Sequence, residues 1–393
     1  MRVRFVNRVF PPAAGATGLY LAELADGLAA HGWDVEVVTG PAPGAPPEET
    51  RASGVCVRRL AGAPVGRSSL LRRAAGYAAL WPRLVRAAAR GPRPDVIVLK
   101  TDPPMLVAAG AWLRRRTGAA VVHWAQDVYP DVAVALGVIP PVAAAPLRAV
   151  AGRALRGADA VVAIGRCMAE RMAGYGVRPE RLHVIPNWAP ASARPDTAAR
   201  DAFRAAHGLD GRFVVMYSGN LGLAHPFEAV LDAAERLAAE RPDVLVLFVG
   251  DGPRRAWVEA EVARRRLPNV RLLPPQPAGA LAGSLGAADL HLVTMEAPLG
   301  GLVVPSKIYG ALAVGRPVLF VGPPESEAAR LVADADAGTV LPPAADGATV
   351  AAAVRRWADD PAAAAEAGAR AATAAASDPV SRFDTLLRSF TQR

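Results

Sequence analysis

One lysine stands where a cation could do chemistry. The chain has 45 basic residues, and only Lys100 and Lys307 among them are lysines. Lys307 directly follows Pro305 and Ser306, and the apolar stretch after it ends at Gly315. Lysine is a compact point charge whereas arginine is a planar fork, and proline favours the first turn of a helix. The spacing predicts a helix whose free N–H groups and lysine bind a phosphate. The alternative is an ordinary lysine on a solvated helix.

A second set of polar side chains follows predicted strands in the first half of the chain. Asp102 comes after one strand, and Gln126, Asp127 and Tyr129 come after the next. A carboxylate at a strand end can orient or deprotonate a hydroxyl, and we interpret Asp127 in this way. It could instead cap the turn that follows. His123 lies inside the strand and is interpreted as a satisfied core or rim histidine.

Three loops of the second half offer backbone and side-chain donors. Their glycines permit a close backbone approach, and the amide of Asn220 and the imidazole of His225 supply hydrogen bonds. The predicted binding residues in these loops are Gly219, Asn220, Leu221, Gly222 and His225, then Gly250 and Asp251, then Gln276.

The first loop of the chain is a further candidate. Residues 7–18 connect a predicted strand to a helix, and Gly15, Thr17 and Gly18 are small enough for backbone N–H groups to approach an anion. The loop does not match the dinucleotide fingerprint, and a plain connection is an equal alternative.

Strand and helix patterns alternate along both halves of the chain. Apolar strands are predicted at 3–6, 35–38, 96–99, 120–123 and 160–164, and again at 213–217, 244–249, 270–272, 290–293 and 318–321. This alternation is typical of a parallel sheet covered on both faces. A length of 393 residues exceeds one ordinary core. The sequence predicts an α/β protein of two Rossmann-like, doubly wound domains facing across a cleft, with ligands at the carboxyl ends of the strands.

The domain boundary is predicted at a stretch rich in Pro, Ala and Ser between 184 and 200. We expect two domains, at 1–188 and at 189–376. The last segment, 377–393, is expected to form a helix that crosses back to the first domain.

Composition excludes several protein classes. No apolar run of membrane-spanning length and no leader pattern is present, so we expect a cytoplasmic protein. Cys56 and Cys167 lack metal spacing. Asp334 and Asp336 have the spacing of a metal motif but lie away from the predicted strand ends, so no metal site is expected.

Charge divides unevenly between the halves. Residues 1–200 carry 26 Lys and Arg against 14 Asp and Glu. No nucleic-acid module matches, so no nucleic-acid partner is expected. Residues 68–93 place Leu70, Ala74, Tyr77, Trp81 and Leu84 on one helical stripe flanked by arginines. Such a stripe either lies on a membrane surface or faces the protein core.

The combination of Ser218-Gly219-Asn220-Leu221-Gly222, Phe248-Val249-Gly250-Asp251-Gly252, Ile185-Pro186-Asn187-Trp188 and Pro305-Ser306-Lys307 resembles retaining family 4 glycosyltransferases of the GT-B fold. Gln126-Asp127-Val128-Tyr129-Pro130 resembles the bacterial O-antigen and colanic-acid branch. The resemblance implies a hexosyl- or N-acetylhexosaminyl-type transferase without metal or cofactor.

The same resemblance implies where the substrates bind. A nucleotide-diphosphate sugar would lie in the second domain, with Val304, Pro305 and Ser306 among its contacts. A polyprenyl-diphosphate-linked or small-molecule acceptor would lie in the first domain, and the enzyme would work at the inner face of the cell membrane.

The departures from this family's pattern shape the predicted mechanism. Asn220 and His225 stand where many members have Arg and Lys, and Gln126 stands where many have His. Leu302 and Gly310 replace a pair of Glu residues, which leaves ribose recognition open. Lys307 is then the expected source of positive charge for the leaving diphosphate, with His225 assisting if protonated, and Asp127 would position the acceptor.

Two rival functions remain open at this point. A nucleotide-sugar epimerase can share the architecture but needs one substrate. A basic membrane or nucleic-acid adaptor needs none.

Overall fold

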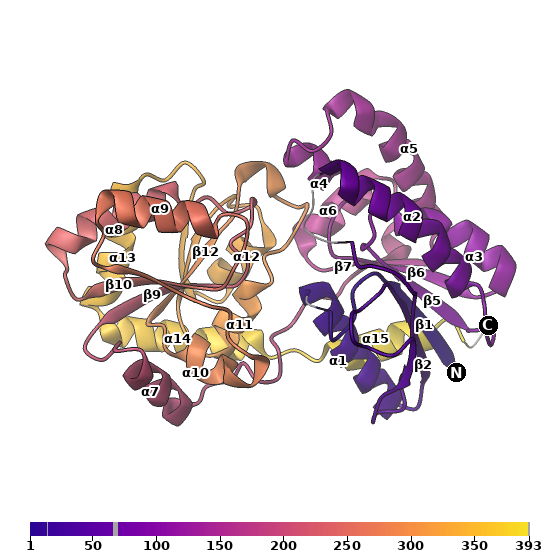
Figure 1. The fold of residues 1–393 in the computed structure, drawn as a ribbon, viewed down its shortest axis with the longest axis horizontal. Helices are drawn as coiled ribbons and strands as arrows, with labels where there is room; N and C mark the ends of the chain where they lie inside the picture. Colours follow the sequence, from indigo (N-terminus) through magenta and orange to yellow (C-terminus); the bar gives the residue numbers. More distant parts are fainter. Residues whose placement is uncertain (14, 66–69, 392–393) are drawn as a thin grey trace. The chain divides into compact units, whose positions relative to one another are not determined.

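The computed structural model describes residues 1–13, 15–65 and 70–391, which form two α/β units (Figure 1). The first unit comprises Met1–Asn187, Gly301–Val304 and Asp378–Arg393, and the second comprises Trp188–Gly300 and Pro305–Ser377. Among the described residues, no helix has both the length and the apolar character needed to cross a membrane.

The first unit is built on a sheet of strand order β3-β4-β2-β1-β5-β6-β7-β8, parallel except for the β3–β4 pair. Its central strands are almost entirely buried because both faces are covered, which explains their unbroken apolar sequences. The strands are β1 (Arg2–Asn7), β2 (Asp34–Thr39), β3 (Glu48–Thr50), β4 (Cys56–Arg59), β5 (Val96–Lys100), β6 (Ala120–Ala125), β7 (Ala160–Ala163) and β8 (Leu182–Val184).

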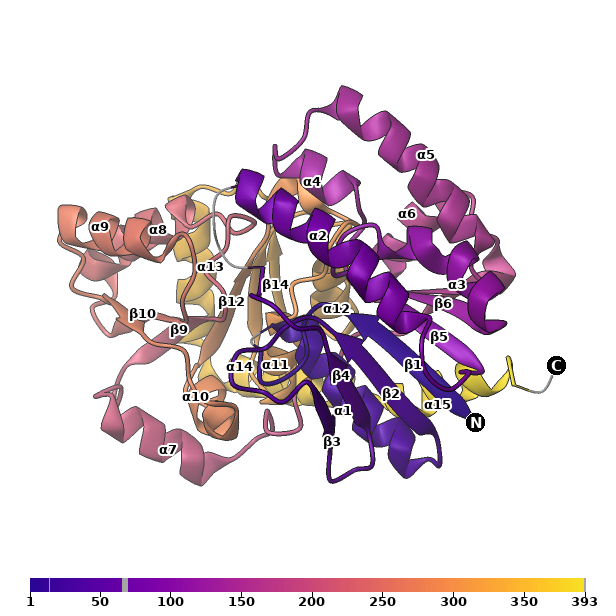
Figure 2. The ribbon, with the colours of Figure 1, turned by 45° about the vertical axis from the view of Figure 1, so that its right-hand side comes forward.

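Helices cover both faces of this sheet. On one face Leu84 and Val85 pack into the core beside the strands. On the other, α1 and the C-terminal helix α15 lie together, since a Cβ at Gly27 would meet Val380 at 2.7 Å. The helices are α1 (Ala16–Ala30), α2 (Leu70–Ala88), η1 (Leu106–Ala109), α3 (Gly110–Thr117), α4 (Asp131–Ala135), α5 (Pro141–Gly157), α6 (Arg166–Gly174), η2 (Pro179–Arg181) and α15 (Pro379–Arg388). Figure 2 shows α2, α3 and α5 on one side of β1, β5 and β6.

The second unit has a fully parallel sheet of order β11-β10-β9-β12-β13-β14. The strands are β9 (Phe213–Ser218), β10 (Val244–Val249), β11 (Val270–Leu273), β12 (Leu290–Thr294), β13 (Val318–Val321) and β14 (Gly338–Leu341). The helices are α7 (Thr197–Ala206), α8 (Glu228–Glu240), α9 (Arg255–Arg265), η3 (Ala278–Ala280), α10 (Leu281–Gly286), η4 (Ala297–Leu299), α11 (Lys307–Ala313), α12 (Glu327–Asp334), α13 (Gly347–Asp359) and α14 (Pro361–Ala375). The predicted doubly wound class is confirmed.

Three local features differ from the sequence prediction. The stretch expected as linker contains the start of α7, which the Asp196 side chain caps at the Ala199 N–H (2.9 Å). The helix expected from Pro305 begins at Lys307 and ends before Gly315, whose φ of +70° suits a helix stop. Residues 301–304 join the first unit, because the Val128 N–H donates to the Leu302 carbonyl at 2.9 Å.

Candidate active site

Lys307 lies at the centre of a compact polar group in the second unit. Its Nζ is 2.7 Å from the Tyr217 hydroxyl and 3.0 Å from His225 Nε2. It also lies 4.3 Å from the centroid of the Tyr217 ring, within cation–π range. Tyr217 lies in β9 and His225 in the loop after it, whereas Lys307 is the first residue of α11. The fold therefore brings together residues about ninety positions apart in sequence.

The hydrogen bonds fix the direction of each donor in this group. His225 Nδ1 is 2.6 Å from the Thr294 carbonyl, which can only accept, so Nδ1 carries the proton and Nε2 accepts from Lys307. The Tyr217 hydroxyl accepts from Lys307 and donates to the Asn220 carbonyl at 2.8 Å. Lys307 therefore fixes the His225 ring directly and, through the Tyr217 hydroxyl, the loop after β9.

Burial controls the charge of this group. Desolvation lowers the pKa of Lys307 to about 7. Burial, together with the neighbouring Lys307 ammonium, lowers the pKa of His225 to about 3. His225 is therefore neutral at physiological pH in the unliganded protein. Its expected assistance as a cation does not apply to this state, so Lys307 carries the positive charge of this group below about pH 7.

Backbone packs tightly where the β9 and β10 loops meet. Gly250 has φ +148°, and a Cβ there would lie 1.9 Å from the Gly219 carbonyl oxygen. Gly219 has φ +127°, and its Cβ would meet the Lys307 side chain at 3.4 Å. Both positions need glycine, because side chains rarely adopt these angles and no room exists beside Gly250. The glycines allow the lysine to lie directly against the loop backbone.

The other predicted donor-side residues differ in their surroundings. The Leu221 N–H donates to the Asp251 carbonyl at 2.9 Å, which joins the first two loops. The Gln276 amide donates to the Pro274 carbonyl at 3.0 Å, within its own turn. Asn220 and Asp251 are exposed, whereas Gly222, Val304 and Pro305 are buried and Ser306 is half-buried.

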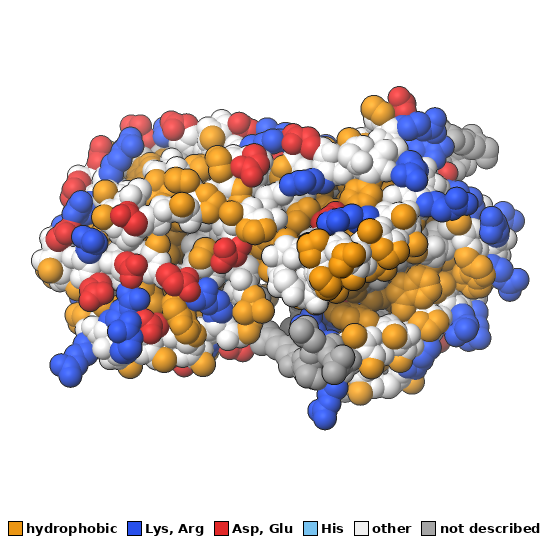
Figure 3. Space-filling model, turned by 90° about the horizontal axis from the view of Figure 1, so that it is seen from above, with side chains coloured by type: hydrophobic (Ala, Val, Ile, Leu, Met, Phe, Trp, Pro, Cys, Tyr) orange, Lys and Arg blue, Asp and Glu red, His pale blue; other side chains and the backbone are white. Residues whose placement is uncertain are grey.

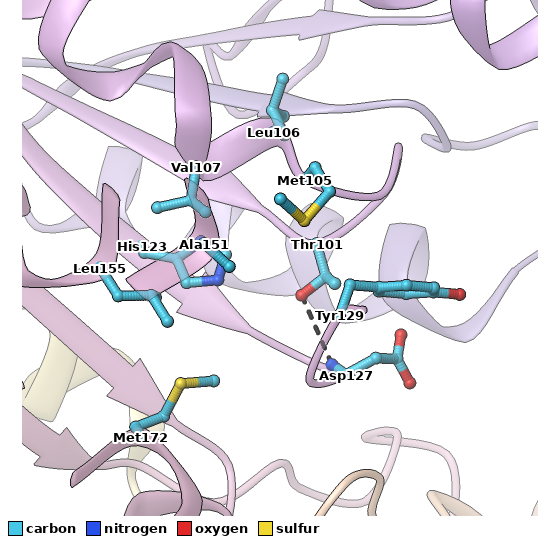
Figure 4. Close-up of a pocket in the computed structure, with 10 residues that line it drawn as sticks. All are labelled: Thr101, Met105, Leu106, Val107, His123, Asp127, Tyr129, Ala151, Leu155 and Met172. Carbon is cyan, nitrogen blue, oxygen red and sulfur yellow. Dashed lines mark hydrogen bonds between the residues drawn. The ribbon is translucent and has the colours of Figure 1, made fainter. Parts of the chain in front are cut away.

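In the first unit, Asp127 lies at the carboxyl end of the sheet beside a small pocket. Thr101, His123, Tyr129, Ala151 and other residues line the pocket with it (Figure 4). The Thr101 hydroxyl accepts from the backbone N–H groups of Gln126 (2.7 Å) and Asp127 (3.4 Å). Thr101 therefore fixes the turn that presents the Asp127 carboxylate.

Several titratable side chains near Asp127 have shifted pKa values. Burial, strengthened by the nearby Asp102 carboxylate, raises the pKa of Asp127 to about 7. Lys100 opposes this shift but is itself fully buried over the Trp124 ring, which lowers its own pKa well below the ordinary value. Burial also raises the pKa of Tyr129. A carboxyl that titrates near neutrality suits proton or hydroxyl handling.

Two predicted acceptor-side residues have protein partners already. Gln126 and Asn187 exchange two side-chain amide hydrogen bonds of 3.1 and 2.9 Å, and both are buried. Asp102 pairs with Arg8 at 2.7 Å. Gln126 therefore connects the end of β6 to the segment after β8 through its amide pairing with Asn187.

The end of the first loop packs against Val9, which lies two residues after β1. Cβ atoms at Gly15 and Gly18 would meet Val9 at about 3 Å, and Thr17 lies in the first turn of α1. Ala14, within the predicted loop, lies outside the described residues. The small residues here let the start of α1 pack closely against Val9.

The predicted membrane stripe is mainly a packing surface in its second half. Leu84 is fully buried and Trp81 packs against the same cluster, whereas Arg72, Arg73 and Ala74 are exposed. Ser68 and Ser69 lie outside the described residues, as do the final two residues of the predicted 377–393 helix.

His123 lies inside the first unit. It is buried and forms a hydrogen bond of 2.9 Å with the Leu99 carbonyl, as expected for a histidine whose hydrogen bonding is satisfied within the protein.

Sequence reasoning missed Tyr217 and Thr101. Tyr217 is the fifth residue of an apolar strand and resembles a core position, although its place directly before Ser218-Gly219 was a usable signal.

The Asp334 and Asp336 pair has the spacing of a metal motif, and Asp336 forms an ion pair with Arg370 at 3.1 Å. No group of three or more metal-ligating side chains is found among the residues that the structure describes.

Comparisons with known proteins identify both halves of the chain. Residues 15–188 match the family model described as glycosyl transferase 4-like domain, and residues 199–374 match the model described as glycosyl transferases group 1. The chain is 29% identical over 339 residues to the putative colanic acid biosynthesis glycosyl transferase WcaI of Escherichia coli strain K12, covering 80% of this chain and 82% of WcaI. It is 29% identical to the probable glycosyltransferase WbjE of Pseudomonas aeruginosa, over 66% of this chain and 65% of WbjE.

Solved structures share the fold. Anabaena HepE in complex with UDP has a TM-score of 0.71 at 18% identity, with all of both chains covered. The sucrose-phosphate synthase of Thermosynechococcus elongatus has a TM-score of 0.74 at 18% identity, over 100% of this chain and 99% of that one. The predicted GT-B fold is confirmed.

Proposed function

We propose that this chain, which belongs to the glycosyltransferases with a 4-like first domain and a group 1 second domain, transfers a sugar from a nucleotide-diphosphate donor to a hydroxyl acceptor. The process would be bacterial polysaccharide biosynthesis, which the name of the relative WcaI, a putative colanic acid biosynthesis glycosyl transferase, supports. The donor would bind the second unit. HepE, whose fold this chain shares, was solved with UDP and with UDP-glucose, which supports a donor of that class.

The observation that carries the donor assignment is the group of Lys307, Tyr217 and His225 at the carboxyl ends of the strands. A diphosphate gains negative charge as the glycosidic bond breaks, and preorganised positive charge aimed at it stabilises the transition state. Lys307 is the cation that this group offers. Binding of the diphosphate would favour its ammonium form and raise the pKa of its Nζ.

The proposed reaction proceeds with retention and without metal or cofactor. The acceptor hydroxyl attacks the anomeric carbon from the face that the diphosphate leaves, and a phosphate oxygen takes the hydroxyl proton. Lys307 stabilises the departing diphosphate, while Asp127 accepts a hydrogen bond from the acceptor and positions it. The acceptor would be a polyprenyl-diphosphate-linked sugar or a small molecule held by the first unit.

The test is incubation of the purified protein with a panel of nucleotide-diphosphate sugars and hydroxyl acceptors, followed by mass spectrometry. We expect a glycosylated acceptor and free nucleoside diphosphate only when both substrates are present. The anomeric configuration of the product, read by NMR, should equal that of the donor. Conversion of a nucleotide sugar without an acceptor would indicate an epimerase instead, and inertness toward every donor would favour an adaptor.

A further inference from the structure

A hollow in the first unit lies at the amino ends of its central strands, opposite the end of the sheet that holds Asp127. Its walls come from β1, from the turn that leads into β5 and from the end of α3, which leads into β6. The space measures about 330 Å³, which lies within the range of about 300–1,000 Å³ that small-ligand sites have. Of the nine described residues that line it, none is acidic or aromatic, and four are arginines: Arg4, Arg93, Arg115 and Arg116.

Three of these arginines have no partner. Arg93, Arg115 and Arg116 are exposed, and none makes an ion pair or a side-chain hydrogen bond within the described part of the chain. Their neighbour Arg114 differs, because it pairs with Asp159. Positive charges gathered without a counter-charge repel one another. A bound anion would remove that repulsion.

The fourth arginine adds positive charge at the back of the hollow. Arg4 is fully buried and shares the Glu36 carboxylate with Arg58, so two guanidinium groups and one carboxylate leave one net positive charge. Burial lowers the pKa of Arg4, Glu36 opposes this shift, and the charge of Arg58 adds to it. A Cβ at Gly91 would lie 3.4 Å from Arg4 Nη2 and 3.8 Å from Arg58 Nη2. Both guanidinium groups therefore reach the wall that Gly91 forms.

A second glycine lets Arg93 lie along the opposite wall. Gly118 ends α3 with φ +71°, and a Cβ there would lie 2.0 Å from Arg93 Nη2. A side chain at position 118 would therefore displace the guanidinium group. Glycine at this helix end permits Arg93, which precedes β5, to lie against the segment that precedes β6.

Helix stabilisation explains only part of this cluster. Residues 114–116 form the last turn of α3, where positive charge is favourable beside the helix C-terminus. Arg4 and Arg93 lie outside that helix and line the same space. In Figure 3, Lys and Arg side chains outnumber Asp and Glu at the right-hand edge of the view, the end of the first unit where α3 lies in Figure 1. Three separate segments thus supply positive charge to one hollow.

We propose that this hollow binds a soluble diphosphate anion through Arg93, Arg115 and Arg116. Each guanidinium fork can bind two phosphate oxygens at once, so three forks suit two linked phosphates better than a single one. The described residues of the hollow offer no aromatic ring to stack on a base and no carboxylate to bind a ribose, so recognition rests on the phosphates. The hollow lies at the amino ends of the strands, whereas Asp127 and Lys307 lie at the carboxyl ends of theirs. The proposal is therefore independent of the proposed function.

The experiment is calorimetric titration of the full chain with inorganic pyrophosphate. The chain carries Lys307→Ala, so that the donor-side lysine does not bind the probe. We expect one binding site, weakened by sodium chloride because exposed charges are screened. Adding Arg93→Gln/Arg115→Gln/Arg116→Gln should weaken binding at least about tenfold, since all three unpaired forks are lost. Unchanged thermal unfolding would show that this variant folds.

A matched control separates the hollow from the general positive charge of the protein. Arg153→Gln/Arg178→Gln/Arg194→Gln, in the same Lys307→Ala background, also removes three exposed arginines without ion pairs in the described part of the chain. It should bind pyrophosphate like its parent. Equal losses in the two triple variants would overturn the proposal, because any three arginines would then serve as well.

Two further results would overturn the proposal. One is the absence of pyrophosphate binding to Lys307→Ala, whether or not the unchanged chain binds it at the donor side. The other comes from titration with ADP, which distinguishes a nucleotide from a free diphosphate. ADP should bind no more tightly than pyrophosphate, and a preference for ADP of about tenfold or more would mean that the base is recognised. None of these measurements uses sugar transfer, so the proposal can fail while the proposed function stands.

Discussion

The ammonium nitrogen of Lys307 lies 2.7 Å from the hydroxyl oxygen of Tyr217, and that hydroxyl donates to the carbonyl of Asn220 at 2.8 Å. A single chain of hydrogen bonds thus connects the start of α11 to the loop after β9. The Lys307 side chain is already held by two residues, Tyr217 and His225, before a ligand binds. Its charge is preorganised, so little rearrangement is needed when a diphosphate arrives.

Replacing Lys307 with Ala should lower turnover strongly while leaving the fold intact. The loss of one charge-assisted contact in the transition state costs about 2–4 kcal/mol. Tyr217→Phe is the matched control, because it keeps the ring and removes only the hydroxyl that positions the lysine; we expect a smaller loss. Steady-state kinetics at saturating donor would measure both. Near-normal turnover of Lys307→Ala would contradict the assigned role.

The pH dependence of kcat/KM for the donor should follow the protonation of Lys307. Its pKa is lowered to about 7, so in the free enzyme the ammonium is lost as pH rises through that value. The kcat/KM for the donor should therefore fall above about pH 7, whereas kcat should fall only at higher pH because bound diphosphate raises the lysine pKa. Lys307→Arg should remove the break near neutrality, since arginine stays charged. A flat kcat/KM profile across this range in the wild-type enzyme would refute the argument.

Most of the fold could be predicted from the sequence because the central strands of both sheets are parallel and buried. Strands such as Val244–Val249 consist only of apolar residues, and the loops between them contain Gly and Pro. The short strand Glu48–Thr50 escaped prediction because its residues are polar and it pairs at the sheet edge. The helix Thr197–Ala206 escaped because the Pro- and Ala-rich stretch before it obscured its start at the Asp196 cap.

Only part of the candidate site could be predicted from the sequence. Lys307 could be proposed from its rarity and Asp127 from its place after a strand, because both signals are local. The Gln126–Asn187 pair joins residues 61 positions apart, and Tyr217 acts through its hydroxyl at the end of a core strand. Such partnerships depend on how strands align, which a single sequence does not specify.

Asp127→Asn should raise the KM for the acceptor more than it lowers kcat, because the carboxylate is assigned to positioning. The folded protein holds this proton up to about pH 7, whereas the unfolded chain releases it near the ordinary 3.8, so the wild type loses stability as pH rises between these two values. The Asn variant should therefore gain stability relative to wild type as pH rises from about 4 to 8. Thermal unfolding across this range would measure the difference. A constant difference would argue against the raised pKa, and an unchanged acceptor KM would argue against positioning.

Transfer should persist after incubation with EDTA and removal of the chelator. The motivation is that Lys307 offers positive charge to the diphosphate at the carboxyl ends of the strands, whereas Asp334 and Asp336 precede β14 and so lie at the amino ends. The control is the same preparation with added magnesium or manganese, which should change the rate little. Complete loss of activity in EDTA, with recovery on adding either ion, would mean that a metal neutralises the diphosphate.

Gly250→Ala should damage both stability and donor binding. The added Cβ would lie 1.9 Å from the Gly219 carbonyl oxygen, and φ at this position is +148°. Backbone cannot yield as a side-chain tip can, so the loop that lies against Lys307 must move, with a strain of about 1–3 kcal/mol. Gly174→Ala is the matched control: its Cβ meets nothing within 4 Å at the end of α6, so helix propensity should leave stability unchanged or raised by about 0.5–1 kcal/mol. Urea unfolding and the donor KM would measure both variants. If Gly250→Ala has the same free energy of unfolding and the same donor KM as wild type, the close contact between the two loops is not needed for the site.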